Sequence, residues 1–176
     1  MRSFNSALSV VLVLLSINVS GQEIKITLGY GSAEFLHVGG NIALYQKSEI
    51  LLTGGHSFEF WNSSSVFSLT MGHRWYLNKK RESNQNKWFF GQKLSYLHQR
   101  RDTYNRNVWF SALCFGRNHF LTRSFGFSWD AGVIYVIREK KVDTNTDLGI
   151  FEFYEPLFKL QPNLRFGVFL TLSDSL

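Results

Sequence analysis

Along most of the chain, apolar and polar residues alternate one by one, which is typical of β-strands with two different faces. The clearest example runs from Ser124 to Ile137. Its apolar face holds Phe125, Phe127, Trp129, Ala131, Val133, Tyr135 and Ile137. Its other face holds Ser124, Gly126, Ser128, Asp130 and Gly132. The pattern predicts a long strand with a carboxylate in the middle of its polar face.

Seven further segments alternate in the same way, at residues 23–30, 36–44, 50–60, 67–77, 88–96, 108–117 and 164–172. Segment 108–117 is apolar on both faces, so its register stays open. Polar stretches connect the segments, and the longest predicted connection spans residues 138–161 with an aromatic patch at 151–158. Both prolines, Pro156 and Pro162, are predicted to lie at the far end of this connection, outside any central strand. We expect eight strands, whose even number places both chain ends on one side.

Alternation alone does not tell which face is buried, because a soluble barrel and a membrane barrel both have a period of two. Three features favour the membrane. The polar positions are often glycine, as a narrow interior requires. They include charges of both signs, and aromatic residues gather at the predicted strand ends, where membrane interfaces attract them. The pattern predicts an all-β fold, an eight-stranded antiparallel up-and-down transmembrane β-barrel. A soluble secreted ligand-binding barrel remains the alternative.

The polar face predicts a network inside the barrel. Charges in a narrow interior must be paired and hydrogen-bonded, and a closed network of this kind leaves no open pore. The residues expected to form the polar network of the lumen are Lys25, His37, Asn41, Glu59, Arg74, Lys93, Asp130 and Arg165.

The first 21 residues do not follow the alternation. They begin with Met1-Arg2, continue with a short apolar run near residues 8–15 and end on small residues around Gly21, which is typical of a secretory signal peptide. The apolar run is too short for a membrane helix. We therefore expect a signal peptide at residues 1–21 and a single barrel domain at residues 22–176.

Composition changes the picture only slightly. The 176 residues carry a formal net charge of +6, a single cysteine and 16% aromatic residues. The lone cysteine excludes an intramolecular disulfide framework. The mean hydropathy of −0.11 averages two faces of opposite character, so it does not exclude a membrane protein.

The sequence shows no recognisable motif for catalysis or for cofactor binding. The five histidines show no metal-binding spacing, no G-x-S-x-G sequence occurs, and adjacent strand residues such as His56 and Ser57 point to opposite faces. We therefore expect no catalytic residue, no metal site and no cofactor. A lipid-modifying enzyme and a narrow, porin-like channel remain as alternatives to a structural or interaction role.

The segment from Asn163 to Leu172 resembles the C-terminal insertion signal of bacterial outer-membrane β-barrels, with Arg165, Gly167, Leu170 and Leu172 in the characteristic positions. It departs from that signal because leucines replace the usual aromatics and four residues follow the strand. The whole chain is similar to small OmpA/OmpX-type and porin-like barrels of Gram-negative bacteria. The resemblance implies a place in the cell outer membrane and recognition by the barrel-assembly machinery.

Cations cluster at predicted strand ends, in 79–81, 100–101 and 138–141. Two interpretations stay open: the cations contact outer-membrane lipid and lipopolysaccharide through charge-assisted hydrogen bonds, or they lie in solvated loops. No nucleic-acid-binding fold accompanies them, so nucleic acid is not an expected partner. The connection 138–161 is the expected contact site for a partner outside the cell.

Overall fold

The structure is a computed structural model that describes residues 23–32, 34–45, 47–59, 64–77, 87–101, 104–143 and 159–172. The predicted signal peptide at residues 1–21 and the aromatic patch at 151–158 lie outside these residues. The strands are β1 (Ile24–Gly31), β2 (Phe35–Tyr45), β3 (Ser48–Glu59), β4 (Ser64–Tyr76), β5 (Lys87–Arg100), β6 (Tyr104–Phe120), β7 (Phe125–Asp143) and β8 (Leu160–Leu172). In the described ranges, helices long and apolar enough to cross a membrane are absent.

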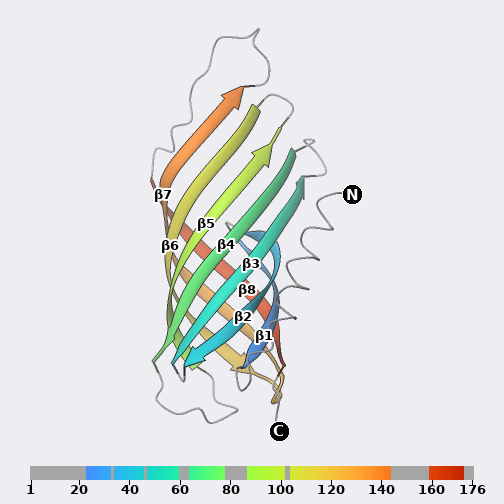
Figure 1. Ribbon diagram of the computed structural model, residues 1–176, viewed down its shortest axis with the longest axis vertical. Coiled ribbons are helices and arrows are strands. Elements are labelled where there is room, and N and C mark those ends of the chain that lie inside the picture. Colours follow the sequence, from blue (N-terminus) through green and yellow to red (C-terminus); the bar gives the residue numbers. More distant parts are fainter. Residues whose placement is uncertain are drawn as a thin grey trace.

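The eight strands form one closed barrel (Figure 1). Each strand pairs with the next in antiparallel orientation, and β8 pairs with β1 to close the sheet. We call the end at which β1 begins and β8 ends the terminal end, and the opposite end the distal end. The predicted fold of eight antiparallel up-and-down strands is confirmed.

The register fixes the dimensions of the barrel. A line of paired residues that starts at Ile26 passes through Leu52, Leu94 and Tyr135 and reaches β8 at Leu160. Ile26 itself pairs with Leu170, so the sheet closes with a stagger of 170 − 160 = 10 residues. For eight strands at ordinary spacings, this stagger corresponds to a strand tilt of about 40°.

The polar and apolar faces that the alternation predicts are the inner and outer faces of the barrel in the structure. On β5, buried and exposed positions alternate from Phe89 to Ser95, with Lys93 buried and Leu94 exposed. The register that the sequence left open is also defined, because Val108, Phe110 and Ala112 of β6 are buried. Their inward position leaves Trp109, Leu113 and Phe115 on the outer surface.

The outer surface is a continuous apolar belt. On β7 the exposed side chains from Phe125 to Tyr135 span about 25 Å along the barrel axis at this tilt, which is the height of the apolar band of membrane barrels. Near the terminal end, Trp88 stacks on Phe115 and meets Trp129 edge to face. Near the distal end, Tyr96 packs against Trp109, so aromatic contacts border the belt at both ends.

The wall of the barrel is uneven in height. β1 has 8 residues and β2 has 11, whereas β6 has 17 and β7 has 19. Consequently β5, β6 and β7 extend furthest at the distal end, as Figure 1 shows. The predicted connection 138–161 was too long, because β7 continues to Asp143 and β8 begins at Leu160. The connection is residues 144–159.

The prediction for Pro162 was also wrong, since this residue lies within β8. Its position explains why a proline is tolerated. The backbone of Leu164 faces β1, where Leu164 accepts from the Ser32 amide and donates to the Ser32 hydroxyl. Pro162 is two residues away and faces the same side, beyond the end of β1. Its missing N–H therefore removes no bond from the sheet.

The lumen as candidate functional site

At the terminal end of the lumen, a buried carboxylate connects three strands. Lys25 of β1 donates from Nζ to Glu49 Oε1 at 2.7 Å, and the Tyr76 hydroxyl of β4 donates to Glu49 Oε2. Asn118 Nδ2 of β6 donates to the Tyr76 hydroxyl at 2.9 Å. Lys25 also lies 3.6 Å from Glu23. Glu49 is 1% exposed, so these contacts replace the water that a carboxylate otherwise requires.

Arg74 of β4 links this group to the centre of the lumen. Its Nη1 lies 3.7 Å from Glu49 Oε2, and its Nη2 lies 3.7 Å from Asp130 Oδ2 of β7. Lys93 of β5 donates to both oxygens of Asp130, at 2.8 and 3.0 Å. In the amide orientation that satisfies its hydrogen bonds, Asn41 of β2 accepts through its side-chain oxygen from Arg74 Nη1 at 3.2 Å. A chain of alternating charges thus runs from β1 across to β7.

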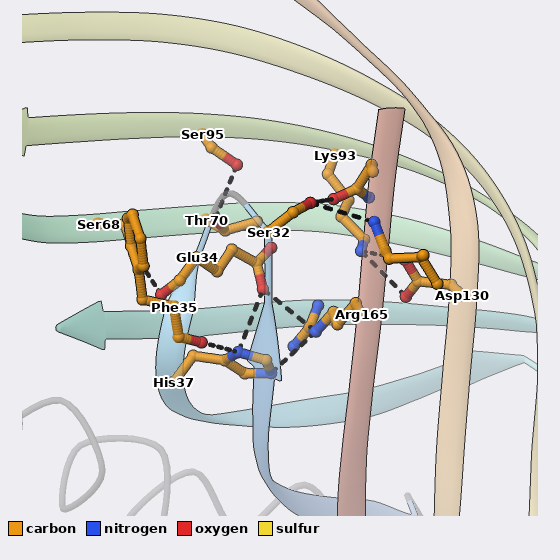
Figure 2. A network of polar contacts seen from close by, with 12 residues as sticks. Ser32, Glu34, Phe35, His37, Ser68, Thr70, Lys93, Ser95, Asp130 and Arg165 are labelled. Atoms are coloured by element: carbon orange, nitrogen blue, oxygen red, sulfur yellow. Dashed lines mark hydrogen bonds and ion pairs between the residues drawn. The ribbon is translucent and has the colours of Figure 1, made fainter. Parts of the chain in front are cut away.

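A third group fills the distal part of the network and is built around the turn between β1 and β2 (Figure 2). Arg165 of β8 reaches Glu34 Oε2 at 3.1 Å and donates from Nε to His37 Nε2 at 2.9 Å. Since that nitrogen accepts, His37 carries its proton on Nδ1, 3.1 Å from the Phe35 carbonyl oxygen. Burial opposes the ionisation of Glu34, but the positive groups around it, of which Arg165 acts most strongly, together outweigh burial and lower the pKa of the carboxyl.

The turn enters the barrel because a glycine makes room for it. Ser68 of β4 donates to the Glu34 carbonyl oxygen at 3.2 Å, which anchors the turn to the inner wall. A methyl group on Gly55 of β3 would overlap that same carbonyl oxygen and the Ser68 hydroxyl. Phe35, which follows Glu34, has a φ of 53°, the left-handed conformation that turns the chain back into β2. The hairpin therefore places a carboxylate inside the lumen.

Of the eight residues predicted for the lumen, seven are buried inside the barrel and connected in these groups: Lys25, His37, Asn41, Arg74, Lys93, Asp130 and Arg165. Glu59 lies in β3, but its side chain falls outside the described part of the structure. The sequence prediction missed Glu49 and Glu34. Continuing the alternation one residue before Ile50 would have found Glu49, whereas a turn residue such as Glu34 carries no periodic signal.

The charges of this ion-pair network are balanced. Four cations, Lys25, Arg74, Lys93 and Arg165, face four carboxylates, Glu23, Glu34, Glu49 and Asp130. Toward the distal end, the inner wall changes character. Val108, Phe110, Ala112 and Ile134 form a buried apolar cluster, against which Leu97 and Val136 pack. The lumen is thus filled by ion pairs in one part and by apolar side chains in the other.

The residues of the C-terminal motif divide between the two faces of β8. Arg165 belongs to the network, and Gly167 pairs with Gly29 of β1, where a methyl group on Gly29 would lie 2.8 Å from the Gly167 Cα. Leu170 and Leu172 face outward in the apolar belt. The alternation predicted both orientations.

Catalytic and metal chemistry finds little support in the described residues. They contain no group of three or more His, Cys, Asp or Glu that could hold a metal ion. Ser48 and His73 are hydrogen-bonded on the outer face, where His73 also packs edge to face on Trp75 at 4.0 Å. Within the described ranges, no carboxylate contacts His73, so the pair lacks the third group that orients a catalytic histidine.

Comparison of the sequence with protein-family models and with curated proteins gives no match. Among solved structures, the chain is similar to the N-terminal β-barrel domain of Pseudomonas aeruginosa OprF, at 14% identity and a TM-score of 0.52, covering 86% of this chain and 96% of that one. It is also similar to neisserial surface protein A (8%, TM-score 0.49, covering 86% and 94%) and to Acinetobacter baumannii CarO (10%, 0.48, 85% and 97%). The first likeness shows a shared β-barrel fold.

Proposed function

We propose that the protein is an integral barrel of the bacterial outer membrane with a structural or interaction role, a closed lumen and no catalytic activity. The apolar belt of about 25 Å supports the membrane location, because a soluble barrel of this size would expose polar side chains there. The resemblance of residues 163–172 to the outer-membrane insertion signal supports the same location. It also favours the barrel-assembly machinery as the partner during insertion.

The observation that carries the closed lumen is the chain of ion pairs from Lys25 through Glu49, Arg74 and Asp130 to Lys93. These side chains come from five strands and meet across the lumen. Separating them to open a path for solutes would expose unpaired charges in a narrow interior, at a cost of several kcal/mol for each pair. A narrow channel is the second candidate function, because the same charges would line its path if the pairs opened.

Two measurements test the proposal. The mature protein is expected to fractionate with outer membranes and to migrate faster on gels before boiling than after. In planar bilayers, the purified barrel is expected to give no stable conductance steps, with an established porin as the positive control. A soluble protein whose mobility boiling leaves unchanged would contradict the membrane location. Stable, voltage-independent conductance would contradict the closed lumen and favour the channel.

A further inference from the structure

The distal ends of β5, β6 and β7 carry a group of cations on their outer face. Residues that pair across antiparallel strands share a face. Trp109 is exposed on the outer surface and pairs with Arg138, and Asn107 pairs with Lys140. Arg100 of β5 pairs with Asn105, two residues from Asn107. Arg100, Arg138 and Lys140 therefore lie on the same outer face, and all three are exposed.

A β-bulge in β7 determines this orientation. The pairing between β6 and β7 shifts at one point, where Phe110 pairs with Val136 but Trp109 pairs with Arg138, so Ile137 is an extra residue. Before the bulge, the even-numbered residues of β7 face inward. After it, they face outward, because one inserted residue exchanges the two faces of a strand. Without the bulge, Arg138 and Lys140 would point into the barrel.

The same bulge turns the neighbouring carboxylate inward. Glu139 pairs in register with Val108, which is buried, and its carboxylate forms an ion pair with Arg106 at 2.5 Å. The described residues of the outer face of this region include no carboxylate. The three exposed cations therefore lie on a surface that attracts anions.

The cations lie beside and beyond the distal aromatic border of the apolar belt, because Arg138 pairs with Trp109 and Lys140 pairs with Asn107. Tyr96 and Trp109 pack together at 5.1 Å between ring centroids, at the level where aromatic residues mark a membrane interface. Asn107 lies two residues from Trp109 toward the distal end of β6 and pairs with Lys140. Its oxygen accepts from the Tyr96 hydroxyl at 2.8 Å and lies 2.7 Å from His98 Nδ1. The amide NH2 of Asn107 is then the group on this side chain that can donate to a ligand.

We propose that this rim patch (Arg100, Asn107, Arg138 and Lys140, next to Tyr96 and Trp109) binds the phosphate groups of an outer-leaflet glycolipid of the lipopolysaccharide type. The aromatic pair lies against the acyl chains, and the cations and the Asn107 amide meet the phosphates by charge-assisted hydrogen bonds. The proposal rests on the membrane location of the barrel. Each cation near such a surface contributes about a five-fold factor in affinity.

The test is binding of diphosphorylated lipid A to the folded barrel in detergent, measured by native mass spectrometry. The variant R138Q/K140Q is compared with the matched control K47Q/R123Q, which removes two exposed cations from turns at the terminal end. We expect about thirty-fold weaker binding for the rim variant and unchanged binding for the control. The single variant R100Q is expected to weaken binding about five-fold. Inorganic phosphate alone is expected not to bind.

Dephosphorylated lipid A separates headgroup recognition from contact with acyl chains. Equal binding of the two glycolipids, or equal weakening by the rim and control variants, would overturn the proposal. Strong binding of inorganic phosphate alone would also overturn it, by assigning the cations to a soluble anion. Failure of the proposed function would be visible separately, as conductance or solubility of the unmodified protein, which the lipid A titration does not measure.

Discussion

At the scale of single residues, Glu49 holds the terminal group of the lumen together. Its two oxygens meet an ammonium, a phenol and a guanidinium, from Lys25, Tyr76 and Arg74. Removing one member of a buried ion pair costs more than the pair contributes, because the remaining charge keeps its desolvation penalty without its partner. The neighbouring cations would then lie close together without this shared anion.

We therefore expect Glu49→Gln to lower the free energy of unfolding by about 3–5 kcal/mol, measured by urea titration of the barrel in detergent micelles. The matched control is Glu139→Gln, whose ion pair with Arg106 lies near the distal rim with side chains 19% and 33% exposed. That change is expected to cost at most about 1 kcal/mol. Equal losses in the two variants would show that the lumen network does not depend on Glu49.

The sequence predicts most of these residues but not their partners. Alternation places Lys25, Arg74 and Asp130 on the inner face, since each lies within a strand that alternates clearly. It does not predict that Glu34 meets Arg165, because that contact depends on a turn that folds into the barrel and on the pairing of β8 with β1. Pairings between distant strands carry no local signal, so the inward residues were predictable and their ion pairs were not.

At the scale of the strands, two adjacent glycines of β3 differ in how much room an added side chain would have inside and outside the barrel. Gly55 faces the lumen beneath the carbonyl of Glu34, whereas Gly54 faces outward, where an added methyl group would lie 4.0 Å from the Ser68 carbonyl oxygen. One position is closed to any side chain and the next is open. The same substitution at these two glycines therefore compares the filled lumen with the outer surface of the barrel.

We expect Gly55→Ala to destabilise the folded barrel by about 1–3 kcal/mol, because the added methyl displaces the turn that carries Glu34. Gly54→Ala is expected to be neutral or to stabilise by up to about 1 kcal/mol, since alanine restricts the unfolded chain more than glycine does. The stability of both variants is measured on gels of unboiled samples, as the fraction of protein that still migrates in the folded form after incubation with increasing urea. A loss of stability in Gly54→Ala equal to that in Gly55→Ala would contradict the turn as the cause.

The bulge of β7 shows where strand patterns stop being informative. Up to Val136 the alternation predicts the faces of β7 correctly. The next residue, Ile137, is also apolar, so nothing in the sequence marks it as the inserted one. As a result the prediction ended the strand there and assigned Arg138, Lys140 and Lys141 to a connection, although they belong to the same strand in opposite orientation.

At the scale of the whole molecule, the number of strands follows from the sequence, but the shape of the barrel does not. Eight alternating segments predict eight strands. The stagger of ten residues and the low wall formed by β1 and β2 depend on how each strand is registered with the next. The low wall in turn allows the turn with Glu34 to fold into the lumen, so a global property positions one of the buried charges.

The two ends of the barrel also differ, which predicts its orientation in the membrane. The connections at the terminal end are residues 46–47, 77–86 and 121–124, whereas the longest connection of the barrel, residues 144–159, joins β7 and β8 at the distal end. Outer-membrane barrels keep short turns on the periplasmic side and longer loops outside. The distal end, with its rim patch, is therefore expected to face the cell exterior and the outer leaflet.

Epitope insertion measures this orientation directly. A tag between residues 150 and 151 is expected to bind antibody on intact cells, whereas a tag between Thr122 and Arg123 is expected to bind only after the outer membrane is permeabilised. Both tagged proteins must show the same mobility shift on boiling, so that a misfolded variant is not scored. The reverse labelling would place Arg100, Arg138 and Lys140 at the periplasmic leaflet, where a lipopolysaccharide-type glycolipid is not available to them. Orientation therefore decides whether the chemistry of the rim patch and the composition of its leaflet agree.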